Sequence, residues 1–525
     1  MLRPRRRAAV VFAPSGEPWT LHGRRSIRRS PLDSRADPQE PIIANTLITR
    51  AQSALATSHR ALGKSRKALA RSGRALAESG KSIAGSAKTR QALGRSRQAL
   101  ARPGQALAGP RLSVARAAGK LAARASRLMG RGAGTAIKGA VMLKIAPQAL
   151  EQLLAGKHLA MVSGTNGKTT TTHFLAAAVR AGLDPGGTRV VHNADGANLH
   201  GGITAALSDN RSATWAIIET DERVVADMIR LGHPEVLVLL NFSRDQLDRH
   251  HEIKALGRSW RNALEAAGER GPVVVANADE PLVVWAAQTA REVVWVDTAT
   301  TWTQDASLCP QCGALLLHDQ PDETGGQGGG WRCSGCELAQ PAASYRVVDG
   351  RIVDPDGKSF DPELQVPGAF NISNAACAMA AAAQLGVPSA TAIAGMRTVT
   401  APAGRFATTR FGDTTARLLL AKNPAGWAEA LPLAQSDVVV LAIDSAAADG
   451  RDVSWLWDVE YEQLAGRTVV ATGPRAQDLA VRLAYAEVAC RCVPDLAEAL
   501  DGHPEPVDVI ATYTPFQRLR KMGGV

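Results

Sequence analysis

Residues Ser163–Thr170, with the sequence SGTNGKTT, combine the side chains that a phosphate-binding loop needs. Gly164 and Gly167 allow backbone N–H groups to close around phosphate oxygens. Lys168 can neutralise the outer phosphates of a nucleoside triphosphate, and Thr169 can ligate its Mg²⁺. These residue types at this spacing predict nucleotide binding and phosphoryl chemistry.

Four cysteines form two C-x-x-C pairs, Cys309–Cys312 and Cys333–Cys336, separated by a polar, glycine-rich span. Each pair presents two thiolates on a tight turn, and the spacing is typical of a four-cysteine zinc ribbon. Four sulfur ligands leave no position open for water, so we expect a structural Zn²⁺. A redox or catalytic role is the alternative. The other cysteines, Cys377, Cys490 and Cys492, are expected to be buried apolar residues.

The phosphate-binding loop lies between a strand and a helix that could position it. Residues 159–162 are apolar and predict a buried strand, and residues 171–181 predict a helix whose N-terminal dipole favours an anion. The strict pattern GxxxxGK[ST] is not met, because Val162 stands at the first glycine position. The alternative is a glycine-rich turn before an ordinary helix, which leaves the order of strand, loop, lysine, threonine and helix unexplained.

Short β-rich segments alternate with alanine-rich helical ones from residue 158 onward. This alternation predicts βαβ units and a parallel sheet, and a further set after Arg405 predicts a second, smaller α/β domain. The strand candidates are 158–164, 188–193, 213–220, 235–241 and 272–277 in the first set, and 415–423, 437–444, 468–473 and 507–513 in the second. Ahead of them, helical patterns begin at Leu112 and near Ala146–Leu154.

The net charge of +12 is unevenly distributed along the chain. Residues 1–140 contain 29 Lys+Arg and 5 Asp+Glu, a balance of +24, which leaves −12 for residues 141–525. Between Ala61 and Leu112 a degenerate seven-residue unit recurs, with glycine and proline inside it. Each unit offers one large apolar residue, so we expect residues 1–110 to be a basic, low-complexity, heptad-like, disordered tail. Contact with lipid headgroups or nucleic acid is the alternative.

We expect neither a membrane span nor a secretory signal in this sequence. No stretch of about 18 uncharged apolar residues is present, and the basic start has neither a convincing apolar core nor a clean cleavage site. We therefore expect a cytoplasmic protein. In that reducing compartment, C-x-x-C pairs are metal ligands more often than disulfides.

Five sequence blocks, in this order, are similar to successive blocks of the MurT family within the Mur ligase superfamily. They are HNADGAN (192–198), IETDE (218–222), NFSRDQLD (241–248), NADEP (277–281) and GAFNISN (368–374). The GTNGKT form of the loop is also similar to that of folylpolyglutamate synthases. The resemblance covers the chain from about Leu112 onward. It implies an α/β fold with a Mur ligase-type P-loop ATPase domain, an inserted zinc ribbon with four cysteine ligands and a smaller C-terminal α/β domain.

The resemblance also implies cofactors and site residues. ATP, Mg²⁺ and a structural Zn²⁺ are expected, with Lys168 and Glu219 as catalytic residues. Thr169 and Glu219 would hold Mg²⁺. The nucleotide would be bound by Gly164, Thr165, Asn166, Gly167, Lys168, Thr169, Thr170, Asn241, Asn371 and Asn374.

Two blocks near the C-terminus, LAKNPAG (420–426) and ADGRDVSWLWD (448–458), resemble the MurT family outside its ATPase region. In that family a class I glutaminase of the GatD type supplies a catalytic Cys and His, and an Asp of the ligase chain orients the His. Asp452 matches this Asp. The resemblance therefore implies a heterodimer with a glutaminase. Its ammonia would amidate D-glutamate of lipid II to D-isoglutamine at the inner face of the membrane.

The expected organisation is a tail at 1–110, an ATPase domain at 111–398 with the ribbon at about 305–340, and a C-terminal domain at 399–525 that contacts the glutaminase. Two other functions remain open. One is an amino-acid-adding Mur or folylpolyglutamate ligase, favoured by GTNGKT alone. The other is a basic zinc-ribbon ATPase that binds nucleic acid. The balance of −12 after residue 140 argues against it, so no nucleic-acid partner is expected.

Overall fold

The structure, a computed structural model, describes most of the chain from residue 108 onward. The described ranges are 108–129, 134–186, 189–194, 196–243, 253–299, 307–319, 330–400, 406–446, 449–503 and 506–524. All of them belong to one compact unit, Pro103–Val525. The predictions made for the repeats and the charge of residues 1–107 lie outside the described residues.

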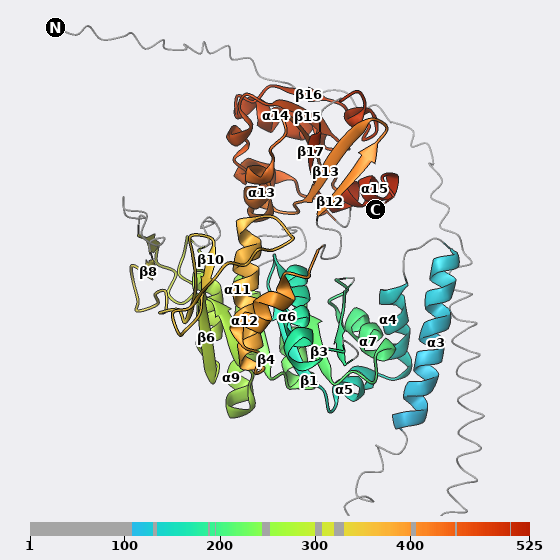
Figure 1. The fold of residues 1–525 in the computed structure, drawn as a ribbon, viewed down its shortest axis with the longest axis vertical. Helices are drawn as coiled ribbons and strands as arrows, with labels where there is room; N and C mark the ends of the chain where they lie inside the picture. The colour runs from blue at the N-terminus through green and yellow to red at the C-terminus, as the bar shows by residue number, and fades with distance from the viewer. Residues whose placement is uncertain are drawn as a thin grey trace, which may run out of the picture. The chain divides into compact units, whose positions relative to one another are not determined.

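A nine-stranded sheet forms the centre of the first domain (Figure 1). Its order is β11-β10-β9-β6-β5-β4-β1-β3-β2, parallel from β2 to β9, with β10 and β11 added as an antiparallel edge. The strands are β1 (His158–Ser163), β2 (Val190–His192), β3 (Trp215–Glu219), β4 (Val236–Leu239), β5 (Val273–Asn277), β6 (Glu292–Asp297), β9 (Tyr345–Val348), β10 (Arg351–Val353) and β11 (Ser359–Phe360).

Helices cover both faces of this sheet because successive side chains of each strand point to opposite sides. Leu159 and Met161 of β1 join the core on one face, and Ala160 and Val162 join the core on the other. The helices are α3 (Ala108–Leu128), α4 (Thr135–Ile145), α5 (Ala149–Leu154), α6 (Lys168–Leu183), α7 (His200–Asp209), α8 (Val225–Gly232), α9 (Ile253–Ala267), α10 (Pro281–Ala287), α11 (Ala369–Gln384) and α12 (Ser389–Met396), with a short 3-10 turn at Gly268–Arg270. The parallel α/β prediction is confirmed.

A small two-stranded sheet interrupts the first domain. Its strands, β7 (Leu316–His318) and β8 (Trp331–Cys333), are antiparallel. Trp331 donates its indole N–H to the carbonyl of Ala278 at 3.0 Å, and the side chains of Leu316, Trp331 and Trp285 share one core. The insert is therefore packed against the body of the first domain.

The second domain is a six-stranded sheet of order β12-β13-β17-β14-β15-β16, in which only β12 and β13 pair antiparallel. Its strands are β12 (Phe406–Phe411), β13 (Thr414–Leu420), β14 (Val438–Ala442), β15 (Thr468–Thr472), β16 (Cys490–Cys492) and β17 (Val507–Ala511). Its helices are α13 (Pro424–Ala430), α14 (Ala476–Tyr485) and α15 (Tyr513–Met522), with 3-10 turns at Leu431–Leu433, Ser454–Asp458, Tyr461–Leu464 and Glu498–Leu500. The smaller α/β domain that the sequence predicts is confirmed.

Two details differ from the sequence predictions. Helix α4 was not expected between α3 and α5, because its residues lie among glycines and are apolar on most sides. Cys492 was expected to be buried, but it is exposed, whereas Cys377 is buried and Cys490 partly buried. Since β16 is the edge strand of the second sheet, one of its sides has no covering strand.

Candidate active site

The phosphate-binding loop lies at the carboxyl end of β1, in the middle of the nine-stranded sheet. Parallel pairing puts Val162 beside Glu219 of β3 and Ser163 beside Leu239 of β4. The loop, Glu219 and the residues after β4 therefore meet at one edge, where ligands bind in open α/β sheets. The alternation of strands and helices in the sequence positions the site in this way.

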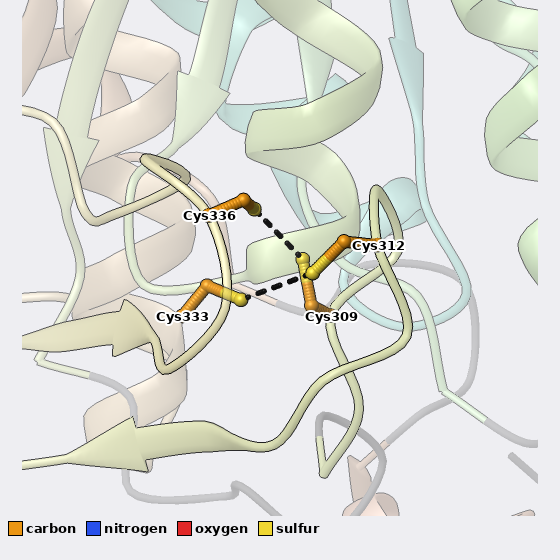
Figure 2. Close-up of side chains that lie close together, drawn as sticks. All are labelled: Cys309, Cys312, Cys333 and Cys336. Atoms are coloured by element: carbon orange, nitrogen blue, oxygen red, sulfur yellow. Dashed lines mark hydrogen bonds between the residues drawn. The ribbon is translucent and has the colours of Figure 1, made fainter.

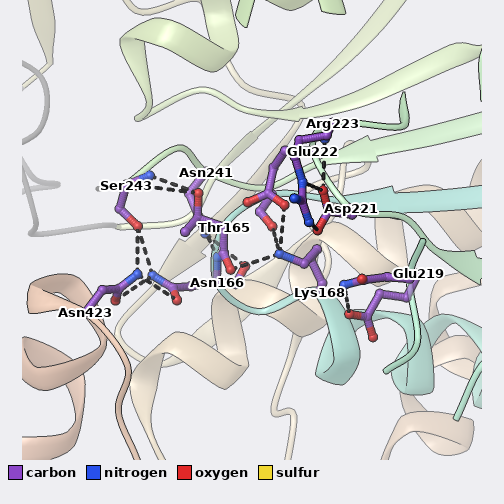
Figure 3. Close-up of polar contacts among 12 residues, drawn as sticks. Thr165, Asn166, Lys168, Glu219, Asp221, Glu222, Arg223, Asn241, Ser243 and Asn423 are labelled. Atoms are coloured by element: carbon purple, nitrogen blue, oxygen red, sulfur yellow. Dashed lines mark hydrogen bonds and ion pairs between the residues drawn. The ribbon is translucent and has the colours of Figure 1, made fainter. Parts of the chain in front are cut away.

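Lys168 is the first residue of α6 and is almost fully buried. Its ammonium donates to the carbonyl oxygens of Gly164 and Thr165, the latter at 3.0 Å, and lies 3.2 Å from Glu222 Oε2 (Figure 3). The lysine charge is thus held inside the loop, with Glu222 as counter-ion. A phosphate bound by the loop would meet this cation without a large rearrangement of the backbone.

Asparagine side chains hold the loop in shape from two other elements. The backbone N–H of Asn166 donates to Asn241 Oδ1 at 2.8 Å, and Asn241 Nδ2 donates back to the carbonyl of Asn166 at 3.2 Å. Gly167 has φ +81°, and a Cβ there would lie 2.3 Å from Asn374 Oδ1 of α11. Asn374 also donates to Asn371 at 3.2 Å. The fold therefore brings the three predicted asparagines together beside the loop.

Glu219 ends β3 with its carboxylate buried beside the first turn of α6. Asn193 accepts from its backbone N–H and donates to its carbonyl, both at 2.8 Å, and Asn198 donates to Oε1 at 2.9 Å. Oε2 has no hydrogen-bond partner among the described residues. A Cβ on Gly196 would lie 3.6 Å from Thr169 Oγ1 and 3.7 Å from this oxygen, so both oxygens border one small space. Hard oxygen ligands of this kind fit Mg²⁺.

The second domain contributes to the same site. Asn166 Nδ2 donates to Ser243 Oγ at 3.0 Å and to Asn423 Oδ1 at 3.3 Å, and Asn423 also caps α13 by accepting from Gly426 N–H at 2.9 Å (Figure 3). A cavity of about 370 Å³ lies beside these contacts. It is lined by residues of both domains, among them Asn166, Gly167, Thr170, Asn241, Asn371, Asn374, Lys422 and Glu429. Burial raises the pKa of the Glu429 carboxyl.

The structure brings the four predicted zinc ligands together (Figure 2). Cys309 Sγ lies 3.6 Å from Cys336 Sγ, Cys312 Sγ lies 3.4 Å from Cys333 Sγ, and all four sulfurs fall within 4.8 Å of one another. Zn–S bonds of about 2.3 Å would place tetrahedral sulfurs roughly 3.8 Å apart. The backbone N–H of Gly335 lowers the pKa of the Cys333 thiol to about 7, whereas the pKa of Cys312 and that of Cys336 are raised in the metal-free cluster. A bound metal would deprotonate all four thiols. The residues present fit a structural Zn²⁺.

Removing two sulfurs should release the metal and destabilise the first domain. We expect the Cys309→Ser/Cys333→Ser protein to contain no zinc by native mass spectrometry and to melt at least about 5 °C lower, because the insert packs on α10. Cys492→Ser, which changes an exposed cysteine on the edge strand β16, is the control and should keep one zinc per chain. Full zinc content in the double variant would contradict the assignment.

Asp452 lies in a different place, on the exposed loop after β14 of the second domain. Its Oδ1 accepts from the backbone N–H of Ser454 at 2.8 Å, and this bond lowers the pKa of the carboxyl. Nearby Asp449 is buried and accepts from the backbone N–H of Thr514 at 2.8 Å, which ties the loop to α15. The buried carboxylate of Asp449 therefore anchors the loop, and the ionised carboxylate of Asp452 lies exposed on its surface.

Several residues of the site were not predicted as site residues. Glu222, Asn193 and Asn198 occur in the quoted sequence blocks, but their partners are fixed only by the sheet. Asn followed by Pro is a common start of a helix, so the pair Asn423-Pro424 does indicate in the sequence that Asn423 caps α13. Its contact with Asn166, 257 residues away, has no signal in the sequence.

Comparison with known families agrees with this geometry. Residues 162–323 match the family described as the Mur ligase middle domain, and residues 420–516 match the family described as MurT ligase C-terminal. The chain is similar to the lipid II isoglutaminyl synthase (glutamine-hydrolyzing) subunit MurT of Staphylococcus aureus strain N315. The two are 30% identical over 377 residues, which cover 68% of this chain and 84% of the relative. The subunit of the same name from Streptococcus pneumoniae strain R6 is 28% identical over 378 residues, which cover 67% of this chain and 82% of that relative.

Two solved structures share the fold at low sequence identity. A pseudomurein peptide ligase type C from Methanothermus fervidus superposes with a TM-score of 0.54 at 18% identity, covering 71% of this chain and 80% of that one. MurF from Acinetobacter baumannii superposes with a TM-score of 0.51 at 14% identity, and the match covers 74% of this chain and 79% of that one. They support the two-domain α/β fold.

Proposed function

The chain belongs to the MurT family, and from that membership we propose that it is the ligase subunit of a glutamine-hydrolysing lipid II isoglutaminyl synthase. The reaction is amidation of the α-carboxylate of D-glutamate in the stem peptide of lipid II, which gives D-isoglutamine. ATP supplies the driving force, and a glutaminase supplies ammonia. The enzyme would act in the cytoplasm at the inner face of the membrane.

The first half-reaction takes place at the phosphate-binding loop. A carboxylate oxygen of the substrate attacks the γ-phosphorus of ATP, the bond to the β-phosphate oxygen breaks, and ADP leaves an acyl phosphate behind. Lys168 lies where it can stabilise charge on the transferred group, and exchanges its contact with Glu222 for the phosphate. Thr169 and Glu219 would hold Mg²⁺, which neutralises phosphate charge when bound.

In the second half-reaction, ammonia attacks the carbonyl carbon of the acyl phosphate. The C–N bond forms, the C–O bond to phosphate breaks, inorganic phosphate leaves, and a proton is lost from nitrogen. This step needs a water-poor site, because water would hydrolyse the acyl phosphate. The cavity between the loop and α13, lined by both domains, is where we place it.

Ammonia is proposed to come from a class I glutaminase bound at the Asp452 loop. Such enzymes use a Cys nucleophile activated by a His, and a carboxylate fixes the tautomer of that His. Asp452 is exposed and ionised, as that role requires. Five residues later Trp457 is 53% exposed, and its ring lies 5.1 Å from that of Tyr485, which is 73% exposed. Exposed aromatic pairs of this kind are typical anchors of protein interfaces.

The observation that supports the proposal most strongly is that the phosphate-binding site and the loop bearing Asp452 occur in one chain. The phosphate-binding site alone fits an amino-acid-adding ligase equally well. The loop bearing Asp452 lies within the part of the chain that matches the MurT ligase C-terminal family. A nucleic-acid-binding ATPase is disfavoured by the balance of −12 over residues 141–525.

Measurement of ATP turnover with lipid II, with and without a class I glutaminase, separates the three functions. We expect glutamine-dependent turnover only when lipid II and the glutaminase are both present, and ammonium-dependent turnover without the glutaminase. Turnover stimulated by a free amino acid and not by ammonium would indicate an amino-acid-adding ligase. Turnover stimulated by nucleic acid would indicate the third function.

A further inference from the structure

Helix α3 has a second apolar face that no described residue covers. Its inner face packs on α4, which in turn packs on α7 (Figure 1). On the outer face, Val114, Leu121 and Leu128 are 45%, 64% and 89% exposed. Their spacing of seven residues is two helical turns, so they form one stripe opposite the buried Leu112 and Gly119. Large aliphatic side chains exposed together along one helix face form a candidate interaction site.

All the charged side chains of α3 itself are positive. Exposed cationic side chains border the stripe, namely Arg111, Lys120, Arg124 and Arg127. No acidic residue occurs in α3 or in α4. The chain before α3 adds the same sign, since residues 1–107 contain 22 Lys+Arg and 5 Asp+Glu, a balance of +17. The partner that complements this helix is therefore apolar and anionic.

We propose that α3 binds the surface of an anionic lipid bilayer. The helix lies parallel to the membrane, with Val114, Leu121 and Leu128 at the boundary of the acyl chains and the arginine and lysine side chains on lipid phosphates. None of the described helices is long and apolar enough to cross a bilayer. A second copy of the chain fits poorly, because two such helices would repel each other and neither offers a carboxylate.

This surface adds to the proposed function a way of holding the ligase where a lipid-linked substrate is presented. It does not depend on that function. Helix α3 contributes no residue to the cavity between the two domains, and lipid vesicles without substrate suffice for the test. Failure of the membrane proposal would leave the amidation proposal unchanged, and the reverse is also true.

The test is vesicle flotation of the full chain with phosphatidylglycerol/phosphatidylcholine vesicles. The variant Val114→Ser/Leu121→Ser/Leu128→Ser should bind at least about tenfold more weakly. The loss should persist in about 1 M NaCl, where screening removes the contribution of residues 1–107. The control variant Val481→Ser/Met522→Ser, which changes exposed apolar residues of α14 and α15, should bind like the wild type.

A charge variant gives the second measurement. Lys120→Gln/Arg124→Gln/Arg127→Gln should weaken binding to anionic vesicles at low salt and leave binding to pure phosphatidylcholine unchanged. All the altered side chains are exposed, so the variants should keep the wild-type circular dichroism. The proposal is wrong if the wild type does not bind the vesicles or if the serine variant binds as tightly as the wild type in high salt. Stripe-dependent dimerisation without vesicle binding would also overturn it.

Discussion

The Lys168→Ala protein should lose ATP-dependent amidation, with kcat lowered by at least about 10³-fold. The lysine ammonium lies inside the loop that would enclose the β- and γ-phosphates, where it donates to the carbonyl oxygens of Gly164 and Thr165. Its removal takes away the cation that stabilises the transferred group, an effect of several kcal/mol in a site that excludes water. The measurement is amidation of lipid II with ammonium and ATP in single-turnover format.

Two comparisons separate this effect from a general loss of structure. Lys144→Ala changes an exposed lysine in the last turn of α4 and should leave the rate unchanged. Lys168→Ala also leaves Glu222 without its counter-ion, so Lys168→Ala/Glu222→Gln should recover stability and not activity. Wild-type amidation by either Lys168 variant would refute the assignment of the phosphate-binding loop.

The Asp452→Asn protein should lose glutamine hydrolysis in the complex by up to about 10⁴-fold, the size of the corresponding effect in the serine protease triad. An amide cannot stabilise the imidazolium that forms when the glutaminase Cys is activated. Ammonium salts should restore amidation completely, because the substitution leaves unchanged the proposed site of acyl phosphate formation at Lys168, Thr169 and Glu219. Glutaminase activity and ammonium-dependent amidation are measured on the same preparation.

Neighbouring carboxylates supply the controls for Asp452. Asp458→Asn should keep glutaminase activity, since it leaves the carboxylate of Asp452 in place. Asp449→Asn should instead lower the melting temperature, because Asp449 is buried and holds the loop to the start of α15. Loss of ammonium-dependent synthesis in Asp452→Asn, with normal glutamine hydrolysis, would place Asp452 in the ligase site and contradict the partner assignment.

Motifs whose residues lie close together in the chain were predictable from the sequence. The loop around Lys168 and the four cysteines that are predicted to bind zinc carry residue types at short fixed spacings, and the structure brings these cysteines together. Strands β1–β5, β13–β15 and β17 were predictable because buried parallel strands are continuous apolar runs. The roles of Lys168 and of Asp452 themselves stay predictions, which the variants above are designed to test.

What the sequence did not reveal depends on contacts between distant residues. The pairing of Lys168 with Glu222 and of Asn166 with Asn423 requires the finished sheet and the approach of the second domain. The antiparallel edge of the first sheet, β10 and β11, was also not predicted, although the sequence contains a signal for its turn. Its β9–β10 turn is Asp349-Gly350, with φ +48° and +72°, and Asp-Gly is a hairpin signal that the sequence does contain.

The central claim is that this chain and a class I glutaminase together transfer the amide nitrogen of glutamine to lipid II. The most direct measurement uses glutamine with an isotopic label on its amide nitrogen, followed by mass spectrometry of the stem peptide. The account predicts that the label appears in D-isoglutamine, with one ADP formed for each amide, and that Asp452→Asn abolishes labelling while unlabelled ammonium still gives product. An unlabelled, unamidated stem peptide with the wild-type complex, or addition of a whole amino acid, would contradict it.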